Sequence, residues 1–194
     1  MQKTKTMTKK LLITLSILPL LASCGMRGGN NAEQQTDIYA EEICEAAIFD
    51  EGAIISGIRW ATRNIDTLGT FAKNSEDTGG FFTFDEAQNA CPQGWRVPTQ
   101  EEFQSLSDVD SKWTTKNGVI GRLFGSESNQ LFLPAAGWRN VGGALQFVGD
   151  VGSYWSSTAY GTRGGWWLWV GFGGSGVSIS LRAYAHSIRC VAIN

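Results

Sequence analysis

Residues 166–184 read WWLWVGFGGSGVSISLRAY, and this stretch decides the fold. Large apolar side chains crowd positions 166–172, and apolar residues alternate with polar ones from 177 to 184, which is the period of a β-strand. The glycines between these runs are typical of a hairpin loop. The segment GFGGSG at 171–176 also matches G-x-G-x-x-G, but a dinucleotide site needs a helix after the glycines. We therefore expect two antiparallel strands here and no nucleotide site.

Helix signals lie earlier in the chain and strand signals mostly later. The first predicted helix spans 83–90 with Thr83 as N-cap, and the second begins at Thr99, where TQEE at 99–102 is a capping box. Alternation places Val177, Ile179 and Leu181 on the inward face of their strand. Further strands are expected at 53–61, 131–133 and 187–193, with a hairpin turn at Gly142-Gly143. The pattern predicts an α+β fold with two early helices and a late antiparallel sheet.

The N-terminus predicts the compartment. Four lysines precede an apolar run of 11 residues from Leu11 to Leu21, and Leu21-Ala22-Ser23-Cys24 follows directly. This run is too short to span a bilayer, and the four residues that follow match a lipobox. We therefore interpret residues 1–23 as a lipoprotein signal peptide and Cys24 as the lipidated residue. Palmitate is among the expected acyl groups. The alternative is an ordinary secretory signal with a cysteine there by chance. Lipidation predicts attachment to the outer membrane, with the cell-surface or periplasmic side left open.

The composition of the remaining chain separates a tether from a folded domain and argues against nucleic acid as a partner. Residues 24–52 are small, acidic or amide-rich and read as a flexible tether, which leaves residues 53–194 as the folded domain. The formal net charge of the chain is −2. A chain without a basic field has no means to condense on phosphates, so nucleic-acid binding is not expected.

Four motifs in this order resemble one family: WATRN at 60–64, ACPQGWRVPT at 90–99, YWSST at 154–158 and SIRCV at 187–191. They are similar to the Fibrobacter succinogenes major paralogous domain, which is common in Bacteroidetes lipoproteins, over about residues 54–194. The resemblance implies a C-type lectin-like fold with two helices, a twisted antiparallel sheet and long loops. It also implies that Trp60, Trp95 and Trp155 are core residues, and that Arg96 and Arg189 brace loops.

The resemblance also pairs Cys91 with Cys190, and an exported protein can form such a disulfide. Two buried free thiols are the alternative. Cys44 is left over, either as a free thiol or as a bridge to another chain.

Signatures of catalysis and of metal binding are missing from the sequence. The single histidine, His186, would have to serve any Ser-His-Asp triad, and we interpret it as a surface or hydrogen-bonded side chain. The calcium-binding motifs of lectins resemble Glu-Pro-Asn and Trp-Asn-Asp, whereas this chain has LPA at 133–135 and WRN at 138–140. We therefore expect no enzymatic activity, no cofactor and no metal.

Aromatic residues in the strands near the C-terminus are the basis for predicting a ligand-binding surface. Alternation places Trp166 on one face and Trp167 with Trp169 on the other, and such rings serve as binding anchors or as core. Together with small residues, they form the mixture found in binding surfaces. The predicted ligand-contact residues are Trp167, Trp169, Arg182, Tyr184 and His186. The sequence thus predicts a lipid-anchored adhesion module for a glycan or protein; the alternative is a structural subunit of a surface appendage.

Overall fold

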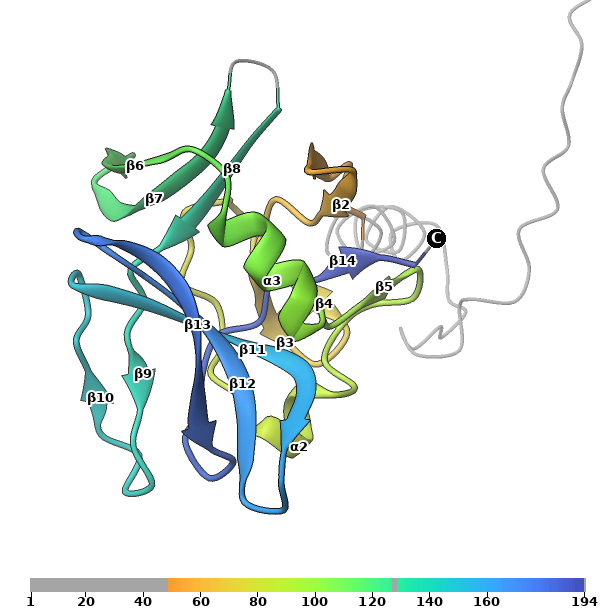
Figure 1. Ribbon diagram of the computed structural model, residues 1–194, viewed down its shortest axis with the longest axis vertical. Helices are drawn as coiled ribbons and strands as arrows, with labels where there is room; N and C mark the ends of the chain where they lie inside the picture. Colours follow the sequence, from red (N-terminus) through yellow and green to blue (C-terminus); the bar gives the residue numbers. More distant parts are fainter. Residues whose placement is uncertain (1–48, 127–128, 194) are drawn as a thin grey trace, which may run out of the picture. The chain divides into compact units, whose positions relative to one another are not determined.

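The computed structural model describes residues 49–126 and 129–193. The lipobox cysteine Cys24, the tether up to residue 48 and Cys44 lie outside these residues. Strands and bridges account for 49% of the described residues and helices for 8% (Figure 1). The predicted α+β, C-type lectin-like fold is therefore wrong: the described body consists of several small antiparallel sheets with two short helices. The helix signals cover only 4 and 8 residues, whereas long strands form in segments 111–126 and 151–160, where no strand was predicted.

One sheet joins the beginning and the end of the body. Its strands follow the order β1 (Ala53–Ile55), β2 (Ile58–Trp60), β14 (Val191–Ala192) and β5 (Trp95–Arg96). The predicted single strand 53–61 is instead a hairpin, because Ser56 and Gly57 both have positive φ angles, of 51° and 77°. A small hairpin of β3 (Ile65–Thr67) and β4 (Thr70–Phe71) follows.

Two three-stranded meanders form most of the remaining body. The first contains β6 (Ser111–Lys116), β7 (Val119–Ser126) and β8 (Asn129–Pro134). The second contains β11 (Val151–Tyr160), β12 (Gly164–Gly171) and β13 (Gly174–Leu181). The hairpin predicted from GFGGSG is confirmed, since Gly171 pairs with Gly174 across a two-residue turn.

A short hairpin lies beside the second meander (Figure 1). It consists of β9 (Trp138–Arg139) and β10 (Leu145–Gln146), and the predicted turn at Gly142-Gly143 is confirmed by a hydrogen bond of 2.8 Å from the Gly143 amide to the Asn140 carbonyl. The Gly137 amide donates to the carbonyl of Val151 at 2.7 Å, which fixes the base of this hairpin to β11.

Both predicted helices form, and local capping explains why. In α2 (Phe84–Ala87), the Thr83 amide donates to the Glu86 carboxylate at 2.8 Å. In α3 (Gln100–Ser107), Thr99 and Glu102 exchange both bonds of a capping box. Phe103 and Leu106 of α3 are completely buried. No helix among residues 49–126 and 129–193 is long and apolar enough to cross a membrane.

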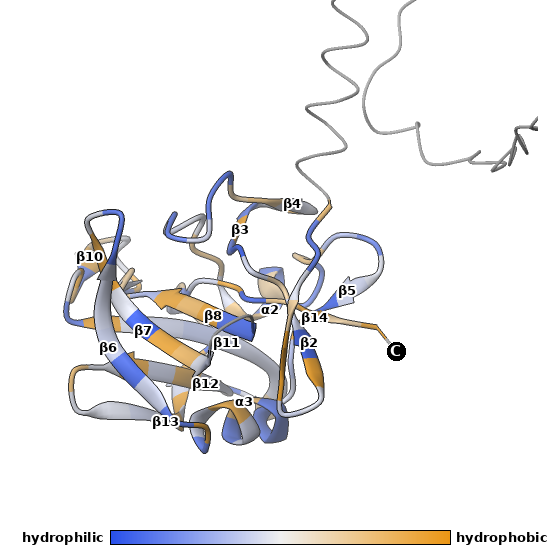
Figure 2. Ribbon diagram, turned by 90° about the horizontal axis from the view of Figure 1, so that it is seen from above, coloured by the Kyte–Doolittle hydropathy of each residue, from blue (hydrophilic) through white to orange (hydrophobic). Residues whose placement is uncertain are grey.

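Two apolar clusters form the core, and Figure 2 shows hydrophobic residues on β8 and β12. Trp60 stacks on Phe103 with ring centroids 5.6 Å apart, and Trp155 meets Phe84 edge to face at 5.3 Å. Trp60 and Trp155 are completely buried, as predicted, and Trp95 is partly buried.

The predicted inward face of β13 is wrong at two positions. Ile179 is 46% exposed and Leu181 is 52% exposed, whereas the Ser180 hydroxyl lies against His186. Near Ile179 and Leu181, the buried face of the sheet is the one that carries Ser180, because His186 and Phe84 lie against it. The α3 helix covers the face that carries Ile179, but only at the far end of the sheet, where Leu168 and Val170 are buried.

Candidate binding face

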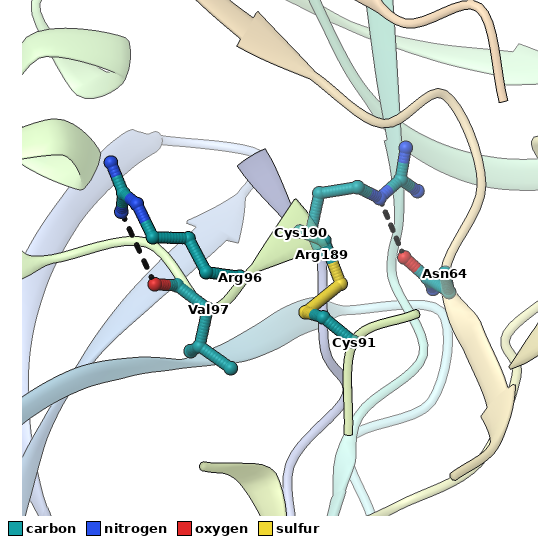
Figure 3. The surroundings of a disulfide bond; sticks show 6 residues. All are labelled: Asn64, Cys91, Arg96, Val97, Arg189 and Cys190. Atoms are coloured by element: carbon teal, nitrogen blue, oxygen red, sulfur yellow. Dashed lines mark hydrogen bonds between the residues drawn. A yellow bond between two sulfur atoms is a disulfide. The ribbon is translucent and has the colours of Figure 1, made fainter. Parts of the chain in front are cut away.

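A disulfide joins Cys190, near the end of the body, to Cys91, and the neighbouring Arg189 contacts the loop after β2 (Figure 3). Cys91 and Cys190 are bonded, so the pairing implied by the family resemblance is confirmed. Arg189, next to this bridge, donates to the Asn64 side-chain oxygen at 2.9 Å and to the Ala61 carbonyl at 3.1 Å. Burial lowers the pKa of Arg189 to about 10, yet the guanidinium remains the charged form at neutral pH. Arg189 therefore braces the loop after β2, as predicted.

Arg96 braces the start of α3 in a similar way. It makes two hydrogen bonds to the Glu102 carboxylate, at 2.8 and 2.6 Å, and one to the Val97 carbonyl at 3.4 Å. Burial opposes ionisation of Glu102, but the bonds from Arg96 and from the Thr99 amide outweigh it and lower the pKa of this carboxyl. Both motif arginines thus serve the fold.

A group of aromatic side chains lies where the β9–β10 hairpin meets the second meander. Phe147 stacks on Trp138 with centroids 4.7 Å apart and planes 20° from parallel, and Trp138 meets Trp167 at 6.2 Å. Trp167 and Trp169 share one face of β12 because they are two residues apart. We call Trp138, Phe147, Trp167 and Trp169 the aromatic face. Phe147 is 55% exposed, and the three indoles are partly exposed.

Glycines of β13 allow the Trp169 indole to lie across that strand. Trp169 pairs with Gly176, and a Cβ atom on Gly176 would come within 3.0 to 3.1 Å of three indole atoms. A Cβ on Gly174 would also meet the ring, at 3.9 Å. One side of this indole therefore rests on backbone without an intervening side chain, which presents a flat aromatic platform at the surface.

His186 lies beneath this face and is 1% exposed. Its Nδ1 atom is hydrogen-bonded to the Ser153 hydroxyl and its Nε2 atom to the Ser180 hydroxyl at 3.1 Å. Its ring meets Trp155 edge to face at 4.2 Å. Burial lowers the pKa of His186 to about 3, so the ring is neutral at physiological pH. Its partners are two hydroxyls and aromatic rings, which supports a packing role.

The two remaining predicted contact residues follow the end of β13. Arg182 forms an ion pair with Asp85 at 3.0 Å and covers the Phe84 ring at 4.5 Å, so it ties the end of β13 to α2. Tyr184 is partly exposed in the turn after β13, where its amide bonds to the Leu181 carbonyl. Of the five predicted residues, the structure brings Trp167, Trp169 and His186 together, and only Trp169 has its ring displayed on a glycine surface.

Trp138 and Phe147 are the members of the face that sequence reasoning missed. The Gly142-Gly143 turn was the available signal, because a hairpin around it pairs Trp138 with Gln146 and leaves Phe147 at its end. Phe147 has a φ of 56°, which an aromatic residue rarely adopts and which no pattern in the sequence indicates.

Comparison with known proteins gives one match. The model of the Fibrobacter succinogenes major domain family matches residues 30–192. No curated protein and no solved structure matches the chain. The match covers most of the sequence and all four motifs, so this chain is a member of the Fibrobacter succinogenes major domain family.

Proposed function

We propose that this chain is a lipid-anchored envelope protein that binds glycans without calcium through its aromatic face. The observation that carries the proposal is the Trp169 indole, which lies across the glycines of β13 on the same face as Trp167, the residue that meets Trp138. The C–H groups of a sugar ring carry partial positive charge, and the face of an indole carries partial negative charge, so flat exposed rings favour stacking with sugars.

The polar surroundings support uncharged hydroxyl-bearing ligands. Ser178 lies opposite Trp167 in the β12–β13 register and shares its face. No group of three or more His, Cys, Asp or Glu side chains in residues 49–126 and 129–193 is arranged to hold a metal ion. The proposed recognition therefore uses ring stacking and hydrogen bonds to hydroxyl groups.

Calorimetry with neutral oligosaccharides of glucose, xylose, mannose and N-acetylglucosamine tests glycan binding by the full-length chain. Trp169→Ala should weaken binding at least tenfold at a temperature where the variant, which also loses the packing of the ring on β13, is fully folded. Tyr160→Ala is the matched control, because Tyr160 is 51% exposed and lies on the opposite face of the same meander. Binding by none of the sugars, or equal weakening by both variants, would overturn the proposal.

The lipid anchor has its own test. Cys24→Ser should abolish incorporation of a labelled acyl chain and release the protein from the membrane fraction, because the lipid is the proposed attachment. Membrane retention of this variant after a high-salt wash would contradict the anchor. Protease treatment of intact cells then separates a cell-surface location from a periplasmic one.

A second function, as a structural subunit of a surface assembly, is favoured by an apolar patch on the opposite face. Tyr160, Ile179 and Leu181 are 46 to 52% exposed, and Trp166 meets Tyr160 at 5.8 Å. Contiguous exposed apolar residues are typical of protein interfaces. Ile179→Lys combined with Leu181→Lys should preserve the melting temperature and remove the chain from crosslinked envelope complexes; unchanged complexes would exclude this role for the patch.

A further inference from the structure

A cavity of about 450 Å³ lies against the β6–β7–β8 meander. Its lining includes two ammonium groups, those of Lys112 and Lys116, and an apolar floor formed by Leu123 and Phe132. Hydroxyl and amide groups make up the remaining polar lining; the described lining residues include no acid, although Thr62 and Ser75 donate hydrogen bonds to the carboxylates of Asp50 and Glu76. The volume is in the range of small-molecule sites.

Strand register explains how these groups come to share one surface. Lys112, Thr114 and Lys116 occupy alternate positions on β6, so their side chains lie on the same face. Lys112 pairs with Leu123, and Leu123 pairs with Phe132, which places a cation and two apolar residues in one row across the sheet. Figure 2 shows this contrast as hydrophilic segments on β6 beside hydrophobic segments on β7.

The floor is shaped by a glycine. A Cβ atom on Gly121 would come within 2.6 Å of the Phe132 ring, so the ring occupies the space that a side chain at 121 would fill. Gly121 pairs with Thr114, so the ring lies over β7 beside the middle of β6. Phe132 is 2% exposed, so the partly exposed Leu123 supplies most of the apolar surface that a ligand would meet.

The positive charge of the cavity is compensated only in part by neighbouring carboxylates. Lys116 donates to the Ser75 hydroxyl at 2.6 Å, a neutral partner. The nearby carboxylate of Glu76 accepts hydrogen bonds from Asn117 at 2.6 Å and from Ser75 at 2.9 Å, and these bonds, together with the charge of Lys116, lower its pKa. Neither lysine forms an ion pair with a carboxylate in the described part of the chain. A ligand with negative charge would thus meet one ammonium group without a carboxylate partner, that of Lys112, and a second, that of Lys116, whose charge Glu76 offsets in part.

We propose that this cavity binds an acidic sugar through its carboxylate. The ammonium groups make charge-assisted hydrogen bonds to the carboxylate, the threonine hydroxyls and Gln130 bond the sugar hydroxyls, and the apolar floor meets the ring. A bare inorganic anion would fill only a small part of 450 Å³. An acidic peptide is disfavoured because extended peptides add to a sheet edge, whereas this cavity lies on a sheet face. The site shares no residue with the aromatic face and does not depend on it.

Titration of the full-length chain with trigalacturonic acid, and with its methyl ester as the matched uncharged ligand, tests the site. The acid should bind and the ester should bind at least tenfold more weakly, because esterification removes the charge. Lys112→Gln should weaken binding of the acid at least fivefold without changing the melting temperature, since this side chain forms no ion pair with the described residues. Lys73→Gln is the matched control, an exposed lysine outside the lining.

Three outcomes would overturn the proposal: equal affinity for the acid and its ester, equal weakening by Lys112→Gln and Lys73→Gln, or binding of a glutamate hexapeptide as tight as that of the acid. Trp169→Ala should leave binding of the acid unchanged. That variant separates the two sites, so a failure of neutral glycan binding at the aromatic face is distinguishable from a failure here.

Discussion

The imidazole of His186 stacks on the indole of Trp167, with ring centroids 5.2 Å apart and planes 21° from parallel. Two serine hydroxyls hold the edges of the imidazole, and none of the carboxylates in residues 49–126 and 129–193 is bonded to it. The ring is therefore a neutral layer between the core and the aromatic face, and its ionisation should couple that face to pH.

Acidification should destabilise the protein through His186. Its pKa is about 3 in the folded state and about 6.5 when unfolded, so the unfolded chain binds a proton that the folded chain does not. The free energy of unfolding should fall as pH drops below 6.5, by up to about 1.4 kcal/mol per pH unit until pH 3. Urea unfolding between pH 7 and pH 5 measures this slope before most carboxylates titrate.

The chain contains one histidine, so a single variant isolates the effect. His186→Asn should flatten the pH dependence between pH 7 and pH 5, whatever its absolute stability. A variant that keeps the full slope would assign the dependence to other groups.

Loss of the Cys91–Cys190 bridge should lower stability by about 2 to 5 kcal/mol, because the bridge constrains an unfolded loop of 99 residues. Thermal unfolding of Cys91→Ala with Cys190→Ala measures the change. Mass spectrometry of alkylated, unreduced protein is the independent check, and modification of both thiols in that experiment would contradict the bridge.

Asp50 should be part of the folded body, although the sequence places it in the tether. Its carboxylate accepts hydrogen bonds from the Thr62 amide at 2.9 Å and the Gly52 amide at 2.8 Å, and it pairs with Arg63 at 3.2 Å. Asp50→Ala should cost about 1 to 3 kcal/mol, because it leaves buried donors without an acceptor.

The neighbouring acid provides the control for this prediction. Glu51 is exposed, so Glu51→Ala should change the free energy of unfolding by less than about 0.5 kcal/mol. A chain that begins at residue 53 should likewise melt lower than one that begins at residue 49. Equal melting temperatures of these two chains would show that residues 49–52 belong to the tether and not to the folded body.

Gly165 should tolerate no side chain. A Cβ atom there would come within 2.2 Å of the Phe84 ring, which is buried against Trp155. Gly165→Ala should destabilise the protein by about 1 to 3 kcal/mol through overpacking. Gly173→Ala, at a position with no atom within 4 Å of its Cβ, should leave the melting temperature nearly unchanged; a similar loss for both would point to backbone effects instead.

Local signals in the sequence determined the features that depend on neighbouring residues. The Thr99–Glu102 capping box predicted α3, and the glycines at 171–176 predicted the hairpin, because helix caps and tight turns are satisfied within a few residues. The four motifs predicted the family, and through that resemblance they also predicted the Cys91–Cys190 bridge.

The fold class and the site depended on contacts between distant segments. Burial of His186 requires β9, β11 and β13 to meet around it, and the exposure of Ile179 follows from which face those segments cover. Alternation identifies two faces of a strand but does not indicate which one is buried. The strands at 111–126 and 151–160 are likewise stabilised by pairing across the sheet, which a single segment does not reveal. The sequence by itself therefore determined the turns, caps and family, and the tertiary structure decided which aromatic rings reach the surface.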